Sequence, residues 1–299
     1  MGDLIHDHGI WTRHNRSVAA AAKRTGKKRV VSPRGMLEPW AIRHRIWKKR
    51  AAWWAYQRKD LTCASALHAT SMQEAKQLRR LGLKLPIIVL PNLIEVPEGL
   101  DRSSRSKREK TAVFLGRIHP KKGLLELVSA WQRVNPEGWK FRIIGPDEDG
   151  HLDELKSAVA DAGLSNSWTF LPPIYDSKRW QELIDAQLMI LPTHSENFGQ
   201  VVAESLAVGT PVLTTTGTPW SDLPTKGCGW YVKPTPDGLA VALKEAMQSS
   251  EEELGKMGDR GSDYIKSKFS RHAVGIQMMQ AYFFCLDNSL PPPECLIFD

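Results

Sequence analysis

Two glutamates stand eight positions apart around the start of a predicted helix. Glu196 precedes the helix over 199–208, and Glu204 lies about two turns along it. Apolar runs at 188–191 and 211–214 are typical of buried strands on either side. A helix that follows a strand offers backbone N–H groups and its positive dipole end to an anion such as a diphosphate. Because carboxylates accept hydrogen bonds from sugar hydroxyls, the segment predicts a site for a sugar-nucleotide.

Two cations follow another predicted strand. Arg117 and Lys122 come directly after the apolar run at 112–115. Taken singly, such charges are more often solvated surface residues, and two glutamates at this spacing occur by chance in many helices. Taken together, Arg117 and Glu196 both follow strands of one predicted parallel sheet, at the edge where open α/β sheets bind ligands. The combination therefore favours a nucleotide-sugar site.

These motifs resemble those of the retaining glycosyltransferases of the GT-B fold, specifically family 4, whose hallmark is Glu, seven residues, Glu. The segment FLGRIHPKKG at 114–123 is similar to the donor-phosphate segment of that family. FRIIG at 141–145 is similar to the next core strand, and WTFLPP at 168–173 to the strand end that contacts the nucleobase. The specific motifs lie within 114–212, and a looser resemblance in element order covers 3–285.

The resemblance implies an α/β fold of two Rossmann-like domains and a role for each matching residue. Arg117 and Lys122 would neutralise the departing diphosphate, Glu196 would orient the donor sugar, and these three are the implied catalytic residues. Glu204 would bind the ribose. No metal is expected, since two cations and a helix end replace it and no Asp-x-Asp loop is present. The other implied donor contacts, backbone N–H groups for the first three, are Asn197, Phe198, Gly199 and Leu171.

Composition restricts the class of protein. The chain has 299 residues, 41% of them hydrophobic, which is enough for two domains of ordinary size. It has no apolar run of the ~18 residues that span a bilayer, and its start has neither a signal-peptide pattern nor a good myristoylation site. The four scattered cysteines form no CxxC pair and are expected to be reduced. We therefore expect a cytoplasmic protein, peripheral on the inner face of the membrane.

The net charge of +8 is unevenly distributed. Residues 1–110 carry 24 Lys and Arg against 9 Asp and Glu, a charge of +15, whereas the remainder carries −7. A basic first third suggests that this part faces an anionic partner. Phospholipid headgroups, a phosphorylated lipid carrier and nucleic acid are the candidates.

Alternating strand and helix patterns indicate parallel sheets in two domains. We assign 1–100 to a partial acceptor-side domain, 101–110 to a polar linker, 111–268 to the nucleotide-sugar-binding domain, and 269–299 to a helix that crosses back in the family, with a short extended tail. Predicted strands of the first domain lie at 3–6, 28–32, 64–71 and 86–91, and its helices at 18–23, 40–59 and 72–81. Those of the second domain lie near 112–115, 140–144, 167–170, 188–191, 211–214 and 229–232, with a last helix at 263–286.

The first domain departs from the family pattern. Its opening segment at 3–9 resembles a strand from the middle of that domain, so the opening strands and a Gly-rich loop are missing. Three explanations stay open: a truncated gene start, a neighbouring chain that supplies the missing part, or a decayed enzyme. A sheet without its early strands would expose an edge and apolar surface, which predicts self-association.

A second departure follows the strand at 28–32. Many relatives have a His here that contacts the donor sugar, whereas this chain has Arg34 at the matching point. The Arg fork of donors suits an anionic sugar or an acceptor phosphate, and an Arg that only stabilises a turn is the equal alternative. His8, with His6, borders the predicted cleft, although a histidine near a strand end is more often a packed residue than a catalyst.

The predicted helix at 40–59 carries tryptophans at seven-residue spacing among basic residues. Trp40, Trp47 and Trp54 share one face of such a helix. Tryptophan with Lys and Arg suits an anionic membrane surface, where lipid-linked acceptors reside. The alternative, that the tryptophans pack on the sheet, is equally open. Single-stranded nucleic acid ranks lower, because no nucleic-acid motif accompanies the basic residues, and none is expected as a partner.

The sequence thus predicts a retaining glycosyltransferase that moves a hexose-type sugar from a nucleoside diphosphate donor to a saccharide or lipid-linked acceptor, in polysaccharide, lipopolysaccharide or glycolipid biosynthesis. The main alternative is a catalytically impaired subunit that binds a nucleotide-sugar and needs a partner chain for transfer.

Overall fold

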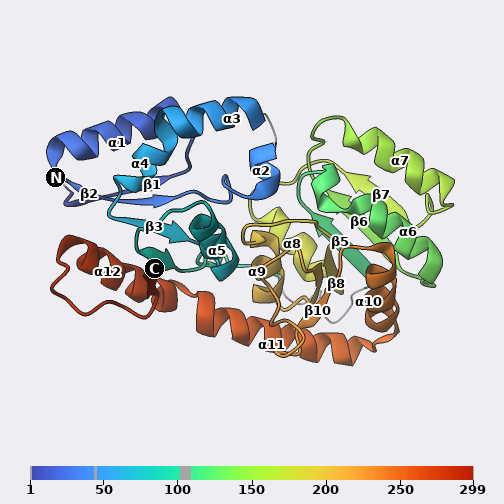
Figure 1. The fold of residues 1–299 in the computed structure, drawn as a ribbon. Coiled ribbons are helices and arrows are strands. Elements are labelled where there is room, and N and C mark those ends of the chain that lie inside the picture. The colour runs from blue at the N-terminus through green and yellow to red at the C-terminus, as the bar shows by residue number, and fades with distance from the viewer. Residues whose placement is uncertain (1, 44–45, 102–108, 299) are drawn as a thin grey trace. The chain divides into compact units, whose positions relative to one another are not determined.

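The computed structural model describes residues 2–43, 46–101 and 109–298. The chain forms two compact units (Figure 1). The first comprises 1–93 together with Ser270–Asp299, and the second comprises Ile94–Phe269. Most of the linker predicted at 101–110 lies outside the described residues, and 94–100 join the second unit.

The first unit is built on a five-stranded sheet in the order β1-β2-β3-β4-β11. Strands β1 to β4 are parallel, and only β11 runs antiparallel, against β4. The register places His8 beside Ser32 at the carboxyl end of the first pair. The elements are β1 Leu4–His8, α1 Arg13–Thr25, β2 Lys28–Ser32, α2 Pro39–Arg43, α3 Ile46–Ala52, the π-helix η1 Trp53–Gln57, α4 Arg58–Thr62, β3 Ala66–Ala69, α5 Met72–Arg80, β4 Ile87–Val89, α12 Arg271–Leu286 and β11 Leu296–Ile297.

Both faces of this sheet are covered, as expected for parallel strands. Val31 and Leu67 belong to an apolar cluster with residues of the helical segments before and after β3. Val30 and Ala66, one residue earlier in each strand, point to the other face and pack with Ala281 and other residues of α12. The alternation along β2 and β3 therefore fixes which helices cover which face.

The helix predicted at 40–59 contains a π-helical turn. It is divided into α2, α3, η1 and α4, and residues 44–45 lie outside the described part of the chain. The π-helical turn brings Gln57 into the interior, where its Oε1 accepts a hydrogen bond of 2.9 Å from the Trp11 backbone N–H. π-helical turns are rare and occur mostly as single turns inside α-helices, and hydrophobic periodicity does not reveal this one.

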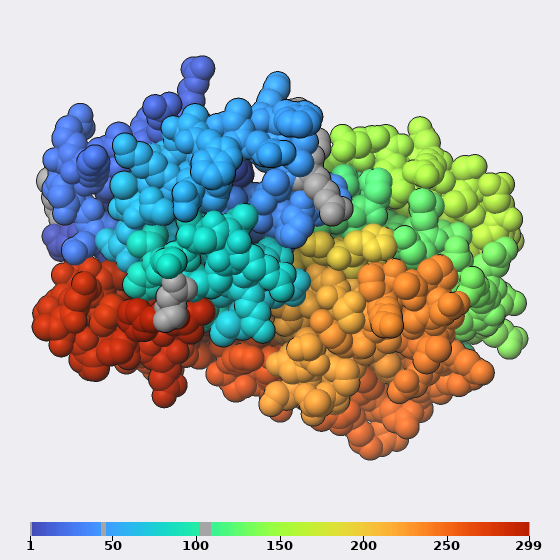
Figure 2. Space-filling view, in the orientation of Figure 1, coloured from blue at the N-terminus to red at the C-terminus, as the bar shows by residue number. Residues whose placement is uncertain are grey.

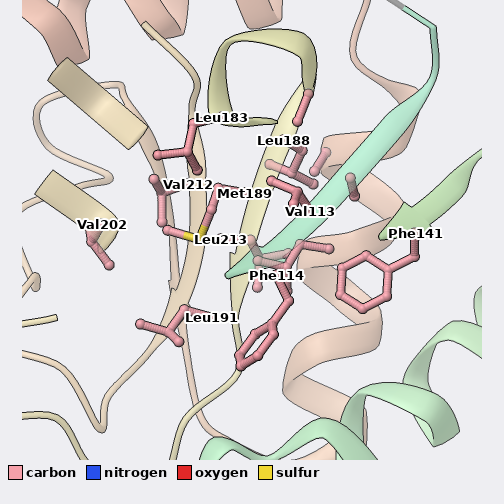
Figure 3. Packing of buried hydrophobic residues seen from close by; sticks show 14 of the residues in the cluster. Val113, Phe114, Phe141, Leu183, Leu188, Met189, Leu191, Val202, Val212 and Leu213 are labelled. Carbon is pink, nitrogen blue, oxygen red and sulfur yellow. The ribbon is translucent and has the colours of Figure 1, made fainter. Parts of the chain in front are cut away.

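The second unit carries a six-stranded parallel sheet in the order β10-β9-β8-β5-β6-β7. Side chains of neighbouring strands fill its core, with Val113, Met189 and Val212 in adjacent register (Figure 3). The elements are β5 Thr111–Leu115, the 3-10 helix η3 Pro120–Lys122, α6 Leu124–Val134, β6 Lys140–Ile144, α7 His151–Asp161, β7 Trp168–Leu171, α8 Lys178–Asp185, β8 Leu188–Leu191, α9 Gln200–Ala207, β9 Val212–Thr215, β10 Gly229–Val232, α10 Pro236–Gln248 and α11 Glu251–Phe269.

The single helix predicted at 263–286 is wrong. Two helices, α11 and α12, meet at Ser270, whose side chain accepts a hydrogen bond of 3.2 Å from the Ala273 backbone N–H and caps α12. The tail is also more ordered than an extended end, because Leu296 and Ile297 pair with β4. The predicted fold class, α/β with two Rossmann-like sheets, is confirmed. Within the described ranges, no helix is both long and apolar enough to cross a bilayer.

Candidate functional site

A pocket of about 370 Å³ lies at the carboxyl ends of β5, β6 and β8 in the second unit. Because β5 pairs with β8, the segments that follow these two strands lie side by side. This is the edge at which open parallel sheets bind ligands. The lining residues are Leu115, Gly116, Arg117, Lys122, Ile144, Gly145, Pro146, Pro173, Ile174, Tyr175, Arg179, Leu191, Glu196, Gly199, Gln200 and Val201.

An ion pair joins the two segments inside the pocket. Lys122 Nζ donates to Glu196 Oε1, and both side chains are largely buried. The loop before Lys122 is fixed to the end of β8, since the Lys121 carbonyl accepts hydrogen bonds from His194 N at 2.9 Å and Thr193 Oγ1 at 3.0 Å. Lys122 is therefore held beside Glu196 by backbone contacts as well as by charge.

Gly123 makes this approach possible. Its φ is +68°, and a Cβ at this position would lie 2.2 Å from the Pro192 carbonyl oxygen. Only glycine combines a left-handed backbone with so close a contact. The residue after Lys122 thus sets the distance between the two segments that carry the ion pair.

Arg117 lies at the mouth of the pocket and binds a carboxylate of its own unit. Its Nη1 donates to both oxygens of Glu148, each at 2.7 Å. The side chains of Arg117 and Glu148 are 61% and 37% exposed, so solvent screens this pair. An exposed pair of this kind is exchangeable, and the guanidinium is available to a competing anion.

The start of α9 completes the polar part of the pocket. Gly199, with φ +75°, is the N-cap residue, and no side chain caps this helix end. Five residues after Gly199, Glu204 is buried and accepts a hydrogen bond from Arg179 Nη2. Burial raises the pKa of Glu204, and the charge of Arg179 opposes that rise. The pair places the buried Glu204 carboxyl directly behind a pocket-lining arginine.

The structure brings together four of the residues predicted for donor binding. Arg117, Lys122, Glu196 and Gly199 all line the pocket. Glu204 is not a lining residue and is connected to the pocket through Arg179.

The remaining donor residues are placed differently. Leu171 is not among the lining residues, because the chain passes the pocket two to four residues later, at Pro173, Ile174 and Tyr175. Neither Asn197 nor Phe198 is a lining residue. Phe198 is buried against Trp220, and its carbonyl accepts a hydrogen bond of 2.6 Å from the Trp220 indole.

Sequence reasoning missed Arg179, Tyr175 and Glu148. Arg179 lies in the first turn of α8, and Glu148 in the loop after β6. Neither belongs to a local motif, and their partners stand 25 and 31 positions away in the chain. Only the tertiary structure identifies them.

The predicted acceptor-side residues His8 and Arg34 belong to the first unit and contact each other. The Arg34 guanidinium donates to His8 Nδ1 from Nε at 3.3 Å and from Nη2 at 3.1 Å. Burial lowers the pKa of His8, and the nearby Arg34 charge lowers it further.

A larger cavity of about 650 Å³ lies elsewhere in the second unit. Its lining includes Lys110 and Trp139, which precede β5 and β6, so it lies at the amino ends of the strands. It holds neither the predicted carboxylates nor the uncapped helix start. The smaller pocket is the candidate site because the converging polar groups are there.

Solved structures share this fold across nearly the whole chain. HepE from Anabaena, solved in complex with UDP-glucose, is similar with a TM-score of 0.76 and 18% identity, over 96% of this chain and 79% of that one. Sucrose-phosphate synthase from Thermosynechococcus elongatus is similar with a TM-score of 0.72 and 19% identity, over 94% and 73%.

Curated relatives match over shorter stretches. D-inositol 3-phosphate glycosyltransferase from Mycobacteroides abscessus is 36% identical over 108 residues, which cover 35% of this chain and 24% of that protein. GDP-mannose:cellobiosyl-diphosphopolyprenol alpha-mannosyltransferase from Komagataeibacter xylinus is 24% identical over 210 residues, 69% of this chain and 53% of that protein. The chain therefore spans between about a quarter and a half of the length of these two relatives.

Two family matches together account for most of the sequence. Residues 3–92 match the glycosyl transferase 4-like domain. Residues 98–263, more than half of the chain, match the glycosyl transferases group 1 family and contain the whole candidate pocket. The chain belongs to the group 1 glycosyltransferases.

Proposed function

We propose that this chain transfers a sugar from a nucleoside diphosphate donor to an acceptor hydroxyl with retention of anomeric configuration. The observation that carries the proposal is the placement of Lys122 against Glu196, beside the uncapped start of α9, at the carboxyl ends of parallel strands. A cation and a helix end suit a diphosphate, and a carboxylate suits sugar hydroxyls.

In this proposal the diphosphate lies between Arg117, Lys122 and the start of α9. When the bond between the anomeric carbon and the diphosphate oxygen breaks, negative charge develops on that oxygen. Fixed cations at this point stabilise the transition state more than the ground state. Glu196 keeps Lys122 in place and accepts hydrogen bonds from the donor sugar. The acceptor oxygen bonds to the anomeric carbon, and its proton leaves with the diphosphate.

The nucleoside end of the donor is assigned to the opposite part of the pocket. Arg179, the pocket-lining partner of Glu204, would lie beside the ribose, and Glu204, which the sequence assigns to the ribose, would act through Arg179. Tyr175, 68% exposed at the pocket, offers a ring for stacking on the base. These assignments replace the predicted contact at Leu171.

We propose that no metal is needed, since Arg117, Lys122 and the helix end supply the positive potential at the diphosphate. Transfer that continues after treatment with excess EDTA would support this. Activity that disappears with EDTA and returns with Mg²⁺ or Mn²⁺ would contradict it.

The similar proteins suggest which donors and acceptors to test. HepE was solved with UDP-glucose, and the Komagataeibacter relative is named for GDP-mannose and a lipid-linked diphosphate acceptor. We therefore propose UDP-hexoses and GDP-hexoses as donors. Saccharides and lipid-linked saccharides are the acceptors to test, as in polysaccharide or glycolipid assembly.

The test is a transfer assay on the purified chain with these donors and a panel of free and lipid-linked saccharides. Release of nucleoside diphosphate together with a product of retained anomeric configuration, read by the proton coupling at the anomeric carbon, supports the proposal. Donor binding without transfer, with transfer restored by a partner chain, would instead support the binding-subunit alternative. Glu196→Gln should lower turnover if the candidate pocket is the active site. Glu137→Gln, beside the larger cavity, is the control and should not.

We also propose that the first unit contacts an anionic membrane surface. Trp47 and Trp54 are 77% and 73% exposed, so the alternative that these two tryptophans pack on the sheet is wrong. Arg50 lies over the Trp47 ring at 5.6 Å and Arg58 over the Trp54 ring at 5.9 Å. Residues near 50 lie at the surface in the space-filling view (Figure 2, light blue). Exposed indoles beside cations match the interfacial region of anionic bilayers.

Vesicle co-sedimentation tests this surface. The chain should bind vesicles of phosphatidylglycerol mixed with phosphatidylcholine more tightly than vesicles of phosphatidylcholine alone. Arg50→Gln should weaken binding about fivefold, the equivalent of about 1 kcal/mol per cation near the surface. Trp54→Ala should weaken binding as well, whereas Trp53→Phe, in the partly buried tryptophan packed on the core, should leave it unchanged. Equal binding to both kinds of vesicle would contradict the proposal.

A further inference from the structure

Arg34 is held in an unusual backbone conformation at the carboxyl end of the first sheet. Its φ is +55°, in the left-handed region that side chains other than glycine rarely adopt. The next residue is fixed as well, because the Gly35 N–H donates to Glu74 Oε1 at 2.8 Å. Such conformations persist where the surrounding structure enforces them, and they are concentrated at functional sites.

The guanidinium of Arg34 has neutral hydrogen-bond partners. Nη1 donates to Asn92 Oδ1, and Nε and Nη2 both donate to His8 Nδ1. Three of its five N–H groups are used in this way, which leaves one on each terminal nitrogen. Among the residues that the structure describes, none forms an ion pair with Arg34.

The nearest carboxylate is committed elsewhere. Glu74 Oε1 accepts from Gly35 N, and Oε2 accepts from the Thr70 backbone N–H at 2.8 Å and the Thr70 hydroxyl at 3.1 Å. Glu74 therefore positions the loop that carries Arg34 without pairing with the guanidinium. A half-buried cation whose hydrogen-bond partners are neutral, and whose neighbouring carboxylate is hydrogen-bonded to other groups, favours an anion at this position.

His8 fixes the orientation of the Arg34 guanidinium. Because Arg34 can only donate, His8 Nδ1 must accept, and the proton of the neutral ring lies on Nε2. This N–H lies on the side of the ring away from Arg34, so His8 serves the guanidinium as an acceptor only. The His8 ring stacks on that of His6 with centroids 4.3 Å apart, which keeps it in place.

A chain of hydrogen bonds keeps the neighbouring histidines neutral. His68 Nε2 donates to the Leu90 carbonyl at 2.9 Å, so its Nδ1 accepts from the Ser32 hydroxyl at 2.6 Å. Ser32 Oγ then accepts from His6 Nε2 at 2.7 Å, and His6 Nδ1 accepts from the Tyr282 hydroxyl at 2.5 Å. Because the Leu90 carbonyl can only accept, it fixes the tautomers of His68 and His6 along this chain. The positive charge of the cluster therefore lies on the Arg34 guanidinium.

We infer that Arg34, held in place by His8 and Asn92, forms a second oxyanion site, which holds a phosphoryl or carboxylate group of the acceptor. This inference rests on the proposed function for its biological meaning, since it gives the transferase a negatively charged acceptor. The two remaining Arg34 N–H groups supply charge-assisted donors for such a group, and His8, which accepts from Nε and Nη2, keeps the guanidinium in place.

Histidine NMR tests the site with methyl phosphate and acetate as probes. Saturating UDP is present, so that the probes do not bind in the candidate pocket of the second unit. The His8 ring signals, assigned with His8→Gln, should shift in a saturable manner with at least one probe. Methyl phosphate alone would identify a phosphorylated acceptor, and acetate alone a carboxylated one. Arg34→Gln should weaken the binding at least tenfold, whereas Arg24→Gln, the same charge change at an exposed position of α1, should not alter it.

Asn92→Asp is a second variant that keeps the side-chain shape and places a carboxylate beside Nη1. It should weaken probe binding to a similar degree even if Arg34→Gln does not fold. No saturable His8 shift in the wild-type chain, or equal shifts in Arg34→Gln, would overturn the inference. Calorimetry with UDP, GDP and ADP judges the proposed function separately. If none of these nucleotides binds, the histidine NMR titration is repeated in Arg117→Gln, which weakens anion binding in the second unit. A failure of the donor pocket is then not mistaken for a failure of the Arg34 site.

Discussion

Arg117 donates from a single nitrogen to both oxygens of Glu148, at 2.7 Å each, at the mouth of the candidate pocket. Glu148 therefore occupies the guanidinium that the proposed function assigns to the donor diphosphate. A donor diphosphate at Arg117 would therefore compete with Glu148 for this guanidinium.

Glu148→Gln should tighten donor binding by about twofold to fivefold, because an exposed ion pair of this kind contributes up to about 1 kcal/mol. Titration calorimetry with UDP measures the change. The control is Asp237→Asn, which removes the carboxylate from the exposed Arg133 pair elsewhere in this unit and should have no effect. Weaker binding in Glu148→Gln would show that Glu148 assists the donor instead of competing with it.

Gly123→Ala should lower both stability and donor affinity. The added Cβ would meet the Pro192 carbonyl at 2.2 Å and would force Lys122 away from Glu196. Gly163→Ala is the matched control, with φ +73° and open space around the Cβ position. Both variants share the backbone strain, of order 1 kcal/mol, so thermal unfolding should show a loss in each. The loss of UDP affinity should be confined to Gly123→Ala.

Removal of Arg179 should make stability depend on pH. Arg179 opposes the rise in the pKa of Glu204 that burial causes, so Arg179→Met should raise that pKa further. The folded carboxyl then binds its proton more tightly than the unfolded one, and stability falls as pH rises above about 4.5. At neutral pH we expect a loss of about 1 to 3 kcal/mol in the unfolding free energy. Urea titrations across this range measure it, and addition of Glu204→Gln should abolish the pH dependence.

The first unit should lose stability in acid through its buried histidines. Burial lowers the pKa of His68 to about 4 and that of His6 to about 3. Between pH 6.5 and those values the unfolded chain binds protons that the folded chain does not, so stability falls as pH falls, by about 1.4 kcal/mol per unit for His68. Hydrogen exchange of β2 and β3 amides reports this locally. His68→Gln should reduce the slope, whereas His14→Gln, at an exposed position, should not.

The sheets were predictable because their strands are continuous apolar runs. The segments at 140–144, 188–191 and 229–232 coincide with β6, β8 and β10. Interruptions of helices were not predictable to the same degree. The break at Ser270 carries an N-cap residue that the helix predicted at 263–286 passed over. The π-turn at η1 contains Gln57, whose hydrogen-bond partner Trp11 lies in another part of the chain.

The candidate site was predictable where it follows strand ends. Arg117, Lys122 and Glu196 converge because β5 and β8 are neighbours, which the alternation of elements suggests. Arg179 lies on a helix and Glu148 in a loop. Tertiary packing brings them next to Glu204 and Arg117, so no spacing in the sequence identifies them. The prediction that the first domain lacks its opening strands stays a prediction.

The most direct test of the central claim is calorimetric titration of the full chain with UDP and GDP. One of them should bind, and Lys122→Gln should weaken binding about tenfold to a hundredfold, as expected when a charge-assisted hydrogen bond is lost. The corresponding nucleoside monophosphate should be affected less, and Lys156→Gln, on the exposed surface of α7, should bind like the wild type. Equal affinity of Lys122→Gln and the wild-type chain for the diphosphate, or no binding of any nucleoside diphosphate, would contradict the account.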